Sequence, residues 1–224
     1  MPSAPPRTLP RGPHQLAREV VLASQRGRMI EAMAEAVADK GYAATTVADV
    51  VARAGVSRRT FYEHFSDRED CFLAAYDAGV DLLLGHLQAE AEADTGLDWA
   101  ERTRRGVRAY LEVLAAEPAF ARTFLIEVLA AGPRALARRA EVHARFVELL
   151  RTQAAQARAD HPELPDVPDE VFRAIVGGVN ELVSTWVREG RGDRLPELEP
   201  VLSYLELSLL AGPRVAAGQL ERAS

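Results

Sequence analysis

Basic and polar side chains gather in one short stretch of the sequence, residues 57–64. The stretch reads Ser-Arg-Arg-Thr-Phe-Tyr-Glu-His, and Ser57 at its start is a residue type that caps helices. The guanidinium groups of Arg58 and Arg59 can each pair bidentately with a guanine in a DNA major groove, a contact worth about 1–3 kcal/mol of discrimination against another base. These residue types and their spacing predict a short helix whose outer face reads base edges.

Such a helix needs a partner helix and a tight turn to present it. Thr46 and Asp49 have the spacing of a capping box, which predicts that a short helix starts before the cluster. Gly55 can adopt positive φ and therefore ends that helix in a turn. Phe61 and Phe65 share a face that can anchor the second helix against the first. The combination predicts a helix-turn-helix.

The rest of the sequence is patterned as helices separated by proline and glycine. Ser66 and Glu69 have capping-box spacing, which predicts the start of a long helix. We find no strand pattern, so the predicted fold class is all-α. Including the partner helices of the motif, helices are expected over residues 25–40, 46–54, 57–65, 67–93, 99–117, 119–130, 134–159, 169–188 and 197–210.

Charge is distributed unevenly along the chain. The formal net charge is -6, but residues 1–65 carry nine Lys and Arg against six Asp and Glu, which gives +3. The remaining residues carry eighteen basic against twenty-seven acidic side chains, which gives -9. One end of the molecule can therefore meet phosphate while the other repels it.

Several classes of protein are disfavoured by what the sequence lacks. A single cysteine allows no intramolecular disulfide, and five scattered histidines give no metal-site spacing, so we expect neither metal nor cofactor. There is no apolar run of about 18 residues and no secretory signal, which predicts a cytoplasmic protein with no membrane partner. A helical enzyme is one alternative, but the motifs for turnover are missing. A ligand-independent scaffold protein is another, but it leaves the charge reversal unexplained.

The sequence resembles a known family over the motif. Residues 46–70 read TVADVVARAGVSRRTFYEHFSDRED, which is similar to the DNA-binding signature of TetR-type repressors, and the resemblance covers roughly residues 25–76. It implies a three-helix helix-turn-helix domain joined by a long fourth helix to a helical domain for ligand binding and dimerisation. The expected divisions are a flexible basic arm over 1–24, the DNA-binding domain over 25–70, the effector-binding and dimerisation domain over 71–214 and a flexible tail over 215–224.

The resemblance also implies roles for single residues. Arg58, Arg59 and Thr60 would face base edges. Tyr62, His64 and Arg68 would contact phosphates, and Thr46 would do so through its helix N-terminus. The expected DNA-binding residues are Thr46, Ser57, Arg58, Arg59, Thr60, Tyr62, His64 and Arg68. The implied partners are double-stranded operator DNA, a small-molecule effector and a second copy of the chain in a homodimer.

Four residues depart from the usual family pattern. Val51 stands where alanine is usual, Arg59 where a small residue is frequent, Arg68 where lysine is usual and Cys71 where leucine is usual. Arg59 makes the base preference of the family unsafe to transfer. Two interpretations of Cys71 are open, an apolar core residue or a thiol that senses oxidation. The arginines within residues 1–24 also leave two, a solvated tail or an arm that enters the minor groove.

The C-terminal half carries apolar stripes at helical spacing, which fit either a dimer interface or an internal core. The resemblance favours dimerisation through Val179, Leu182, Val183, Trp186, Leu202, Leu205 and Leu209. Aromatic and polar residues of the middle helices are candidates to line a cavity for a mostly apolar effector: Tyr110, Phe120, Phe124, His143, Phe146 and Asn180. The function expected is that of a ligand-responsive transcriptional regulator, a repressor that the effector releases from a palindromic operator.

Overall fold

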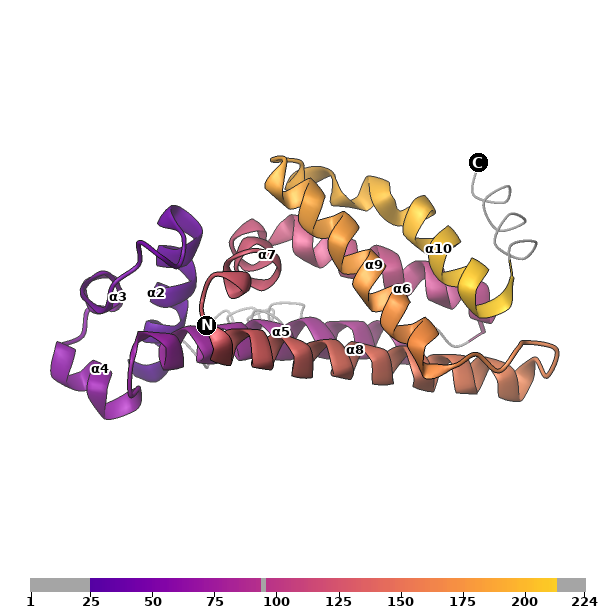
Figure 1. Ribbon diagram of the computed structural model, residues 1–224, viewed down its shortest axis with the longest axis horizontal. Coiled ribbons are helices and arrows are strands. Elements are labelled where there is room, and N and C mark those ends of the chain that lie inside the picture. The colour runs from indigo at the N-terminus through magenta and orange to yellow at the C-terminus, as the bar shows by residue number, and fades with distance from the viewer. Residues whose placement is uncertain (1–24, 94–95, 213–224) are drawn as a thin grey trace, which may run out of the picture.

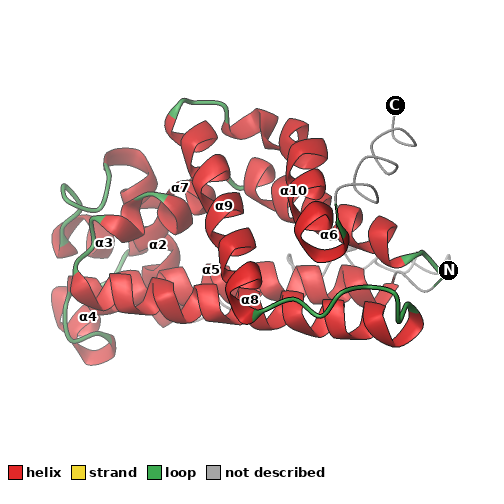
Figure 2. Cartoon of the chain, turned by 45° about the vertical axis from the view of Figure 1, so that its right-hand side comes forward, coloured by secondary structure: helices red, strands yellow, loops and turns green. Residues whose placement is uncertain are grey.

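The computed structural model describes residues 25–93 and 96–212. These residues form helices, turns and loops without any strand, which confirms the predicted all-α fold (Figure 2). No helix among them is long and apolar enough to cross a membrane. The predicted arm over 1–24 and the predicted tail over 215–224 lie outside the described residues.

Helices α2, α3 and α4 form one end of the molecule, and two long helices, α5 and α8, run side by side away from it (Figure 1). Helices α6, α9 and α10 pack over the long pair, and α7 lies between them and α2. The elements are α2 Gln25–Lys40, α3 Val47–Ala54, α4 Arg58–His64, α5 Arg68–Ala93, α6 Trp99–Ala116, α7 Pro118–Leu125, η1 Glu127–Leu129, α8 Pro133–Asp160, α9 Asp169–Arg188, η2 Gly192–Leu198 and α10 Glu199–Ala211.

The predicted caps of the helix-turn-helix are present. Thr46 caps α3 by accepting from the Asp49 backbone N–H, while the Asp49 carboxylate accepts from the Thr46 N–H at 2.7 Å. Gly55 ends α3 with φ 64°, where no Cβ is present to resist the left-handed conformation. Ser57 caps α4 by accepting from the Thr60 N–H at 3.0 Å. Local hydrogen bonding therefore sets where both helices begin.

The predicted capping box at the start of the long fourth helix was wrong by one residue. Asp67, not Ser66, accepts from the N–H three residues later, at 2.7 Å. Asp70 returns to the Ser66 N–H at 2.9 Å, which is the role expected of Glu69. Glu69 is instead drawn towards Arg134 at the start of α8, 3.5 Å away. A second acidic residue at the helix start thus displaced the expected pairing.

Two predicted helices are also divided differently. The helix expected over 119–130 ends at Leu125, and the 3-10 turn η1 follows after Ile126. The helix expected over 197–210 is preceded by η2, whose Pro196 lacks the N–H needed for a continuous α-helical ladder. By contrast, the bounds predicted for 169–188 coincide with those of α9.

One connected apolar core runs through both ends of the molecule, from Met29 in α2 to Leu202 in α10. Phe61 joins it from α4, and Tyr76 joins it from α5. Cys71 is also buried in this core, and burial raises the pKa of its thiol to about 12. Because the thiolate is the reactive form, this position favours the core interpretation of Cys71 over an oxidation sensor.

Candidate DNA-reading helix and ligand cavity

Helix α4 has one buried face and one exposed face. Phe61 is fully buried beneath the helix, and Phe65 directly after it is also buried. On the other side, Arg58 is exposed, the side chain of Arg59 is 90% exposed and Tyr62 is 53% exposed. The aromatic anchors fix the helix in place, while its basic and phenolic side chains stay exposed to solvent.

Some polar groups of α4 bond to each other along the helix. Arg59 Nε lies 3.0 Å from Glu63 Oε1, one turn further on. An exposed pair of this kind contributes little to stability, so it can open at small cost when another acceptor arrives. The hydroxyls of Ser57 and Thr60 lie 3.0 Å apart, and Thr60 is half-buried. His64 is exposed at the end of the helix.

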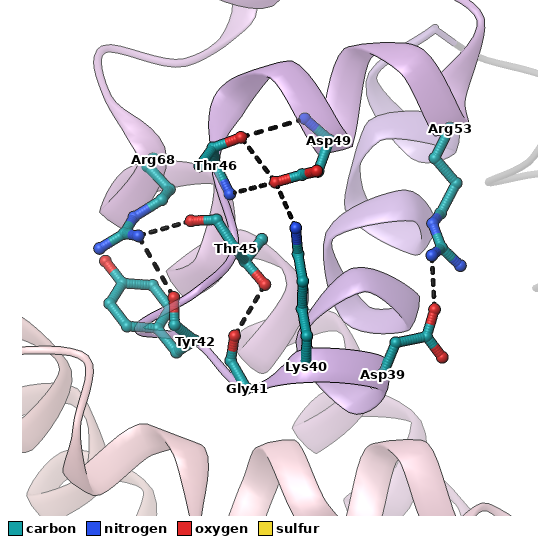
Figure 3. A network of polar contacts seen from close by, with 9 residues as sticks. All are labelled: Asp39, Lys40, Gly41, Tyr42, Thr45, Thr46, Asp49, Arg53 and Arg68. Carbon is teal, nitrogen blue, oxygen red and sulfur yellow. Dashed lines mark hydrogen bonds and ion pairs between the residues drawn. The ribbon is translucent and has the colours of Figure 1, made fainter.

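Arg68 lies across the turn between α2 and α3 rather than in open solvent (Figure 3). Its Nη1 donates to the Tyr42 carbonyl at 3.2 Å and to the Thr45 carbonyl at 2.5 Å. The guanidinium also stacks over the Tyr42 ring, with its carbon 4.2 Å from the ring centroid. The structure therefore shows Arg68 tying α5 to the start of the helix-turn-helix, a role that the sequence had not indicated.

The Thr46 cap is held by a cation as well (Figure 3). Lys40 at the end of α2 contacts Asp49 at 2.7 Å. Hydrogen bonds from Lys40 and Thr46 hold the pKa of Asp49 well below its usual range. Thr46 itself is exposed, but its hydroxyl and its backbone N–H are both bonded to Asp49 here.

Arg26 is a basic residue near α4 that sequence reasoning missed. Its guanidinium carbon lies 5.1 Å from the centroid of the Phe65 ring, and the residue is exposed. This cation–π contact places a positive charge beside the end of α4. Helical periodicity relates residues within one helix, so it gave no sign that Arg26 of α2 lies beside Phe65 at the end of α4.

A buried carboxylate joins the C-terminal part of the molecule to the turn after α2. Glu127 of η1 accepts a hydrogen bond from the Tyr42 N–H at 2.8 Å and lies 3.0 Å from Arg122 Nε. It is 8% exposed. A second link joins Asp67 to Arg134 at the start of α8, at 3.0 Å. A displacement of η1 or α8 would therefore be transmitted to the helix-turn-helix through these two contacts.

A cavity of about 200 Å³ lies between α5, α6, α7, α8, α9 and α10, with the 161–168 loop along one side. Most of its lining is apolar. Five of the six residues predicted for an effector cavity do line it: Tyr110, Phe124, His143, Phe146 and Asn180. Phe120 does not line it; this ring packs against α5 at Gly79, where an added Cβ would lie 2.3 Å from it, and stacks on Phe124.

Four polar side chains in the cavity have distinct environments. Asn180 accepts from Arg139 at 2.8 Å. Burial, assisted by the nearby Arg139 charge, lowers the pKa of His143 to about 4, so its ring is neutral at pH 7. Burial raises the pKa of the Tyr110 phenol, which therefore stays protonated. Burial also raises the pKa of Glu206 to about 7. Sequence reasoning missed Glu206, although a lone acid between leucines was a visible signal.

The predicted dimer residues separate into three groups. Val183 and Leu202 are fully buried within the single chain, so their placement on a dimer surface was wrong: they belong to the internal core. Val179 lines the cavity. Leu182 and Leu209 are exposed, Leu205 is half-exposed, and Trp186 is half-buried beneath Arg191, whose guanidinium carbon lies 4.0 Å from the ring centroid.

The two short helices, the left-handed turn between them and the exposed basic face of α4 define a helix-turn-helix DNA-binding protein. Comparison with known proteins agrees: residues 29–75 match the profile of "Bacterial regulatory proteins, tetR family". The helix-turn-helix segment of the chain is therefore similar to that of TetR-family transcriptional regulators.

Relatives and solved structures extend the comparison over the chain. It is 29% identical to the HTH-type transcriptional activator FasR of Mycolicibacterium smegmatis over 105 residues, so the match spans about half the length of each protein. It is 27% identical to an uncharacterized HTH-type transcriptional regulator of Mycobacterium tuberculosis over 88% of this chain and 82% of that one.

Two structures called FadR share its fold. The fatty acid degradation regulator of Bacillus halodurans has a TM-score of 0.73 at 19% identity, covering 89% of this chain and 97% of that one. The regulator of Bacillus subtilis, solved in complex with stearoyl-CoA, has a TM-score of 0.71 at 19% identity, covering 83% and 97%. At this level of identity the likeness concerns the fold alone.

Proposed function

We propose that the protein is a homodimeric repressor that binds a palindromic operator through α4 and is released by a mostly apolar small molecule. The observation that carries this proposal is the two-sided character of α4, with aromatic anchors buried and basic side chains exposed at one end of the molecule. We assign the DNA-binding domain to residues 25–70 and the effector-binding and dimerisation domain to 71–214.

On the DNA side, α4 would lie in the major groove. Arg58, Arg59 and Thr60 would face base edges, with Arg59 leaving Glu63 to do so. The remaining contacts would go to phosphate and position the helix without specifying sequence. We assign them to Thr46, Ser57, Tyr62, His64 and Arg68, with the free guanidinium nitrogens of Arg68 still available beside its two carbonyl contacts.

A dimer would be formed by the outer face of α9 and α10. Leu182 on α9 is exposed, and so are Val201, Tyr204 and Leu209 on α10. The three α10 positions recur at helical spacing and form one apolar stripe. A two-fold axis through this face would present two copies of α4 to one duplex, and the operator would then be a palindrome.

The effector would occupy the apolar cavity and act through α7 and η1. Phe124 of α7 lines the cavity. Glu127, three residues further along the chain in η1, accepts the hydrogen bond from the Tyr42 N–H. A shift of α7 on ligand binding would be passed to the turn that leads into α3. The stearoyl-CoA complex of the Bacillus subtilis regulator gives a precedent for an apolar ligand on this fold. By linkage, DNA must weaken ligand binding by the same factor that ligand weakens DNA binding.

The proposal is tested by selecting bound sequences from random duplex DNA with the full-length protein, together with its mass in solution. We expect a dimer and an enriched palindrome with guanine in each half-site. No enrichment at low salt would refute operator binding, and a monomer that enriches a single half-site would refute the dimer. Because FasR is named an activator, transcription from a promoter that contains the selected site decides repression.

A further inference from the structure

Two buried glutamates on α10 differ sharply in their partners. Glu199 lies 3.1 Å from Arg104 Nε, accepts from the Ser203 hydroxyl at 2.9 Å and lies 3.6 Å from Arg108. Glu206, two turns further along, is just as buried at 6% exposure, yet it has no hydrogen bond or ion pair within residues 25–93 and 96–212. Glu199 therefore has a structural explanation within the chain, and Glu206 has none.

Glu206 lines the same cavity as Trp99, Tyr110 and Phe146, so its unpartnered carboxyl is surrounded by a space large enough for a ligand. Burial without a partner is unfavourable for a carboxylate, and a leucine or glutamine at this position would cost less free energy to bury. The carboxylate becomes favourable only when a positive charge enters the cavity with it.

The titratable groups that face the cavity do not supply that charge. Helix α5 contributes Glu90, which lies 3.5 Å from Arg105. Helix α6 contributes Arg102 and Tyr110, and α8 contributes Arg158, which pairs with Asp166, and the neutral His143. Helix α9 contributes no titratable group. No ion pair joins any of these described groups to Glu206, and burial raises the pKa of Glu206 to about 7.

We propose that Glu206 is the anchor for a basic nitrogen of the effector, which makes the effector class a mostly apolar amine or quaternary ammonium compound. This rests on the proposed function, in which the cavity holds the effector. The aromatic rings that line the cavity suit such a ligand, because a cation is attracted to the faces of Trp and Tyr as well as to the carboxylate.

The test uses three probes of the same apolar body and different charge: phenylbutylamine, phenylbutanol and phenylbutyrate. Their affinities for the full-length protein are measured by calorimetry with the parent, with Glu206→Gln and with the control Glu90→Gln, a second acid that lines the cavity. We expect the amine to bind about tenfold or more tightly than the alcohol to the parent and to Glu90→Gln. In Glu206→Gln this preference should vanish.

The dependence on pH gives a second readout. Between pH 6 and 8 the affinity of the parent for the amine should rise as Glu206 ionises, whereas the affinity for the alcohol should stay level. In Glu206→Gln both should stay level. Retention of the rise in the variant would assign it to another group and overturn the inference.

The opposite ligand class has its own signature. Tighter binding of phenylbutyrate than of the amine, lost in Arg102→Gln, would overturn the inference and make the cavity a carboxylate site. Equal affinity of amine and alcohol, including no measurable binding of the amine, would overturn it as well. Operator selection is independent of both results. A protein that selects a palindrome but does not bind the amine would therefore refute only this inference. Amine binding that needs Glu206, without any DNA selection, would instead refute the proposed function.

Discussion

Glu127 offers a direct test of how the two ends of the molecule are joined. Its carboxylate accepts from the Tyr42 N–H at 2.8 Å and pairs with Arg122, and it is buried where η1 meets the turn after α2. Glu127→Ala would leave the buried N–H without an acceptor, which costs about 1–3 kcal/mol. Glu127→Gln keeps one carbonyl oxygen for that N–H and should lose less.

The assay is denaturant unfolding of the full-length protein at one fixed concentration, because dimerisation makes apparent stability depend on concentration. DNA affinity is measured on the same variants. The control is Glu148→Ala on α8, which removes an exposed ion pair with Arg151 and should change stability by no more than about 0.5 kcal/mol. If Glu127→Ala unfolded like Glu148→Ala and bound DNA like the parent, the inferred link between η1 and the helix-turn-helix would be wrong.

Three further predictions concern single positions. Burial raises the pKa of Glu206 from 4.5 to about 7, so the folded state loses stability as pH rises through this range. Glu206→Gln should therefore be more stable than the parent by about 3 kcal/mol at pH 8 and equally stable at pH 4. Unfolding measured at both pH values tests this. Gly55→Ala should lower stability by about 1 kcal/mol through backbone strain alone, since no atom lies within 4 Å of the added Cβ, and its melting temperature tests this. Arg58→Ala should weaken binding to the selected operator by about 1–3 kcal/mol and relax its base preference, whereas Tyr62→Phe should weaken binding to all duplexes alike, both measured by titration of several sequences. If Arg58→Ala and Tyr62→Phe had the same effect on every duplex, the proposed placement of α4 on the DNA would be wrong.

Local signals in the sequence were enough to place the helix-turn-helix. The Thr46 cap, the left-handed Gly55 and the Ser57 cap each depend on residues within three positions, and all three are present in the structure. The proline that precedes α9 likewise agrees with its start at Asp169. Where two acids competed for one role, at Asp67 and its neighbours, the sequence did not decide the pairing.

The C-terminal half was less predictable because the apolar residues of α9 and α10 are divided between buried and exposed positions. Periodicity showed which residues are apolar but not what covers them, so Val183 and Leu202 were placed at a dimer surface although they are internal. Phe120 was placed in the cavity for the same reason, and it packs on Gly79 instead. The cavity brings together helices far apart in the chain, and only the fold shows that Glu206 lies in it.

The central claim, that α4 makes this chain a sequence-specific DNA-binding protein, is tested most directly by one titration. The full-length protein is titrated against the selected palindrome and against a scrambled duplex of the same composition, at several salt concentrations. We predict that the palindrome binds at least about a thousandfold more tightly and that both affinities fall steeply with salt. Equal affinity for the two duplexes would contradict the claim.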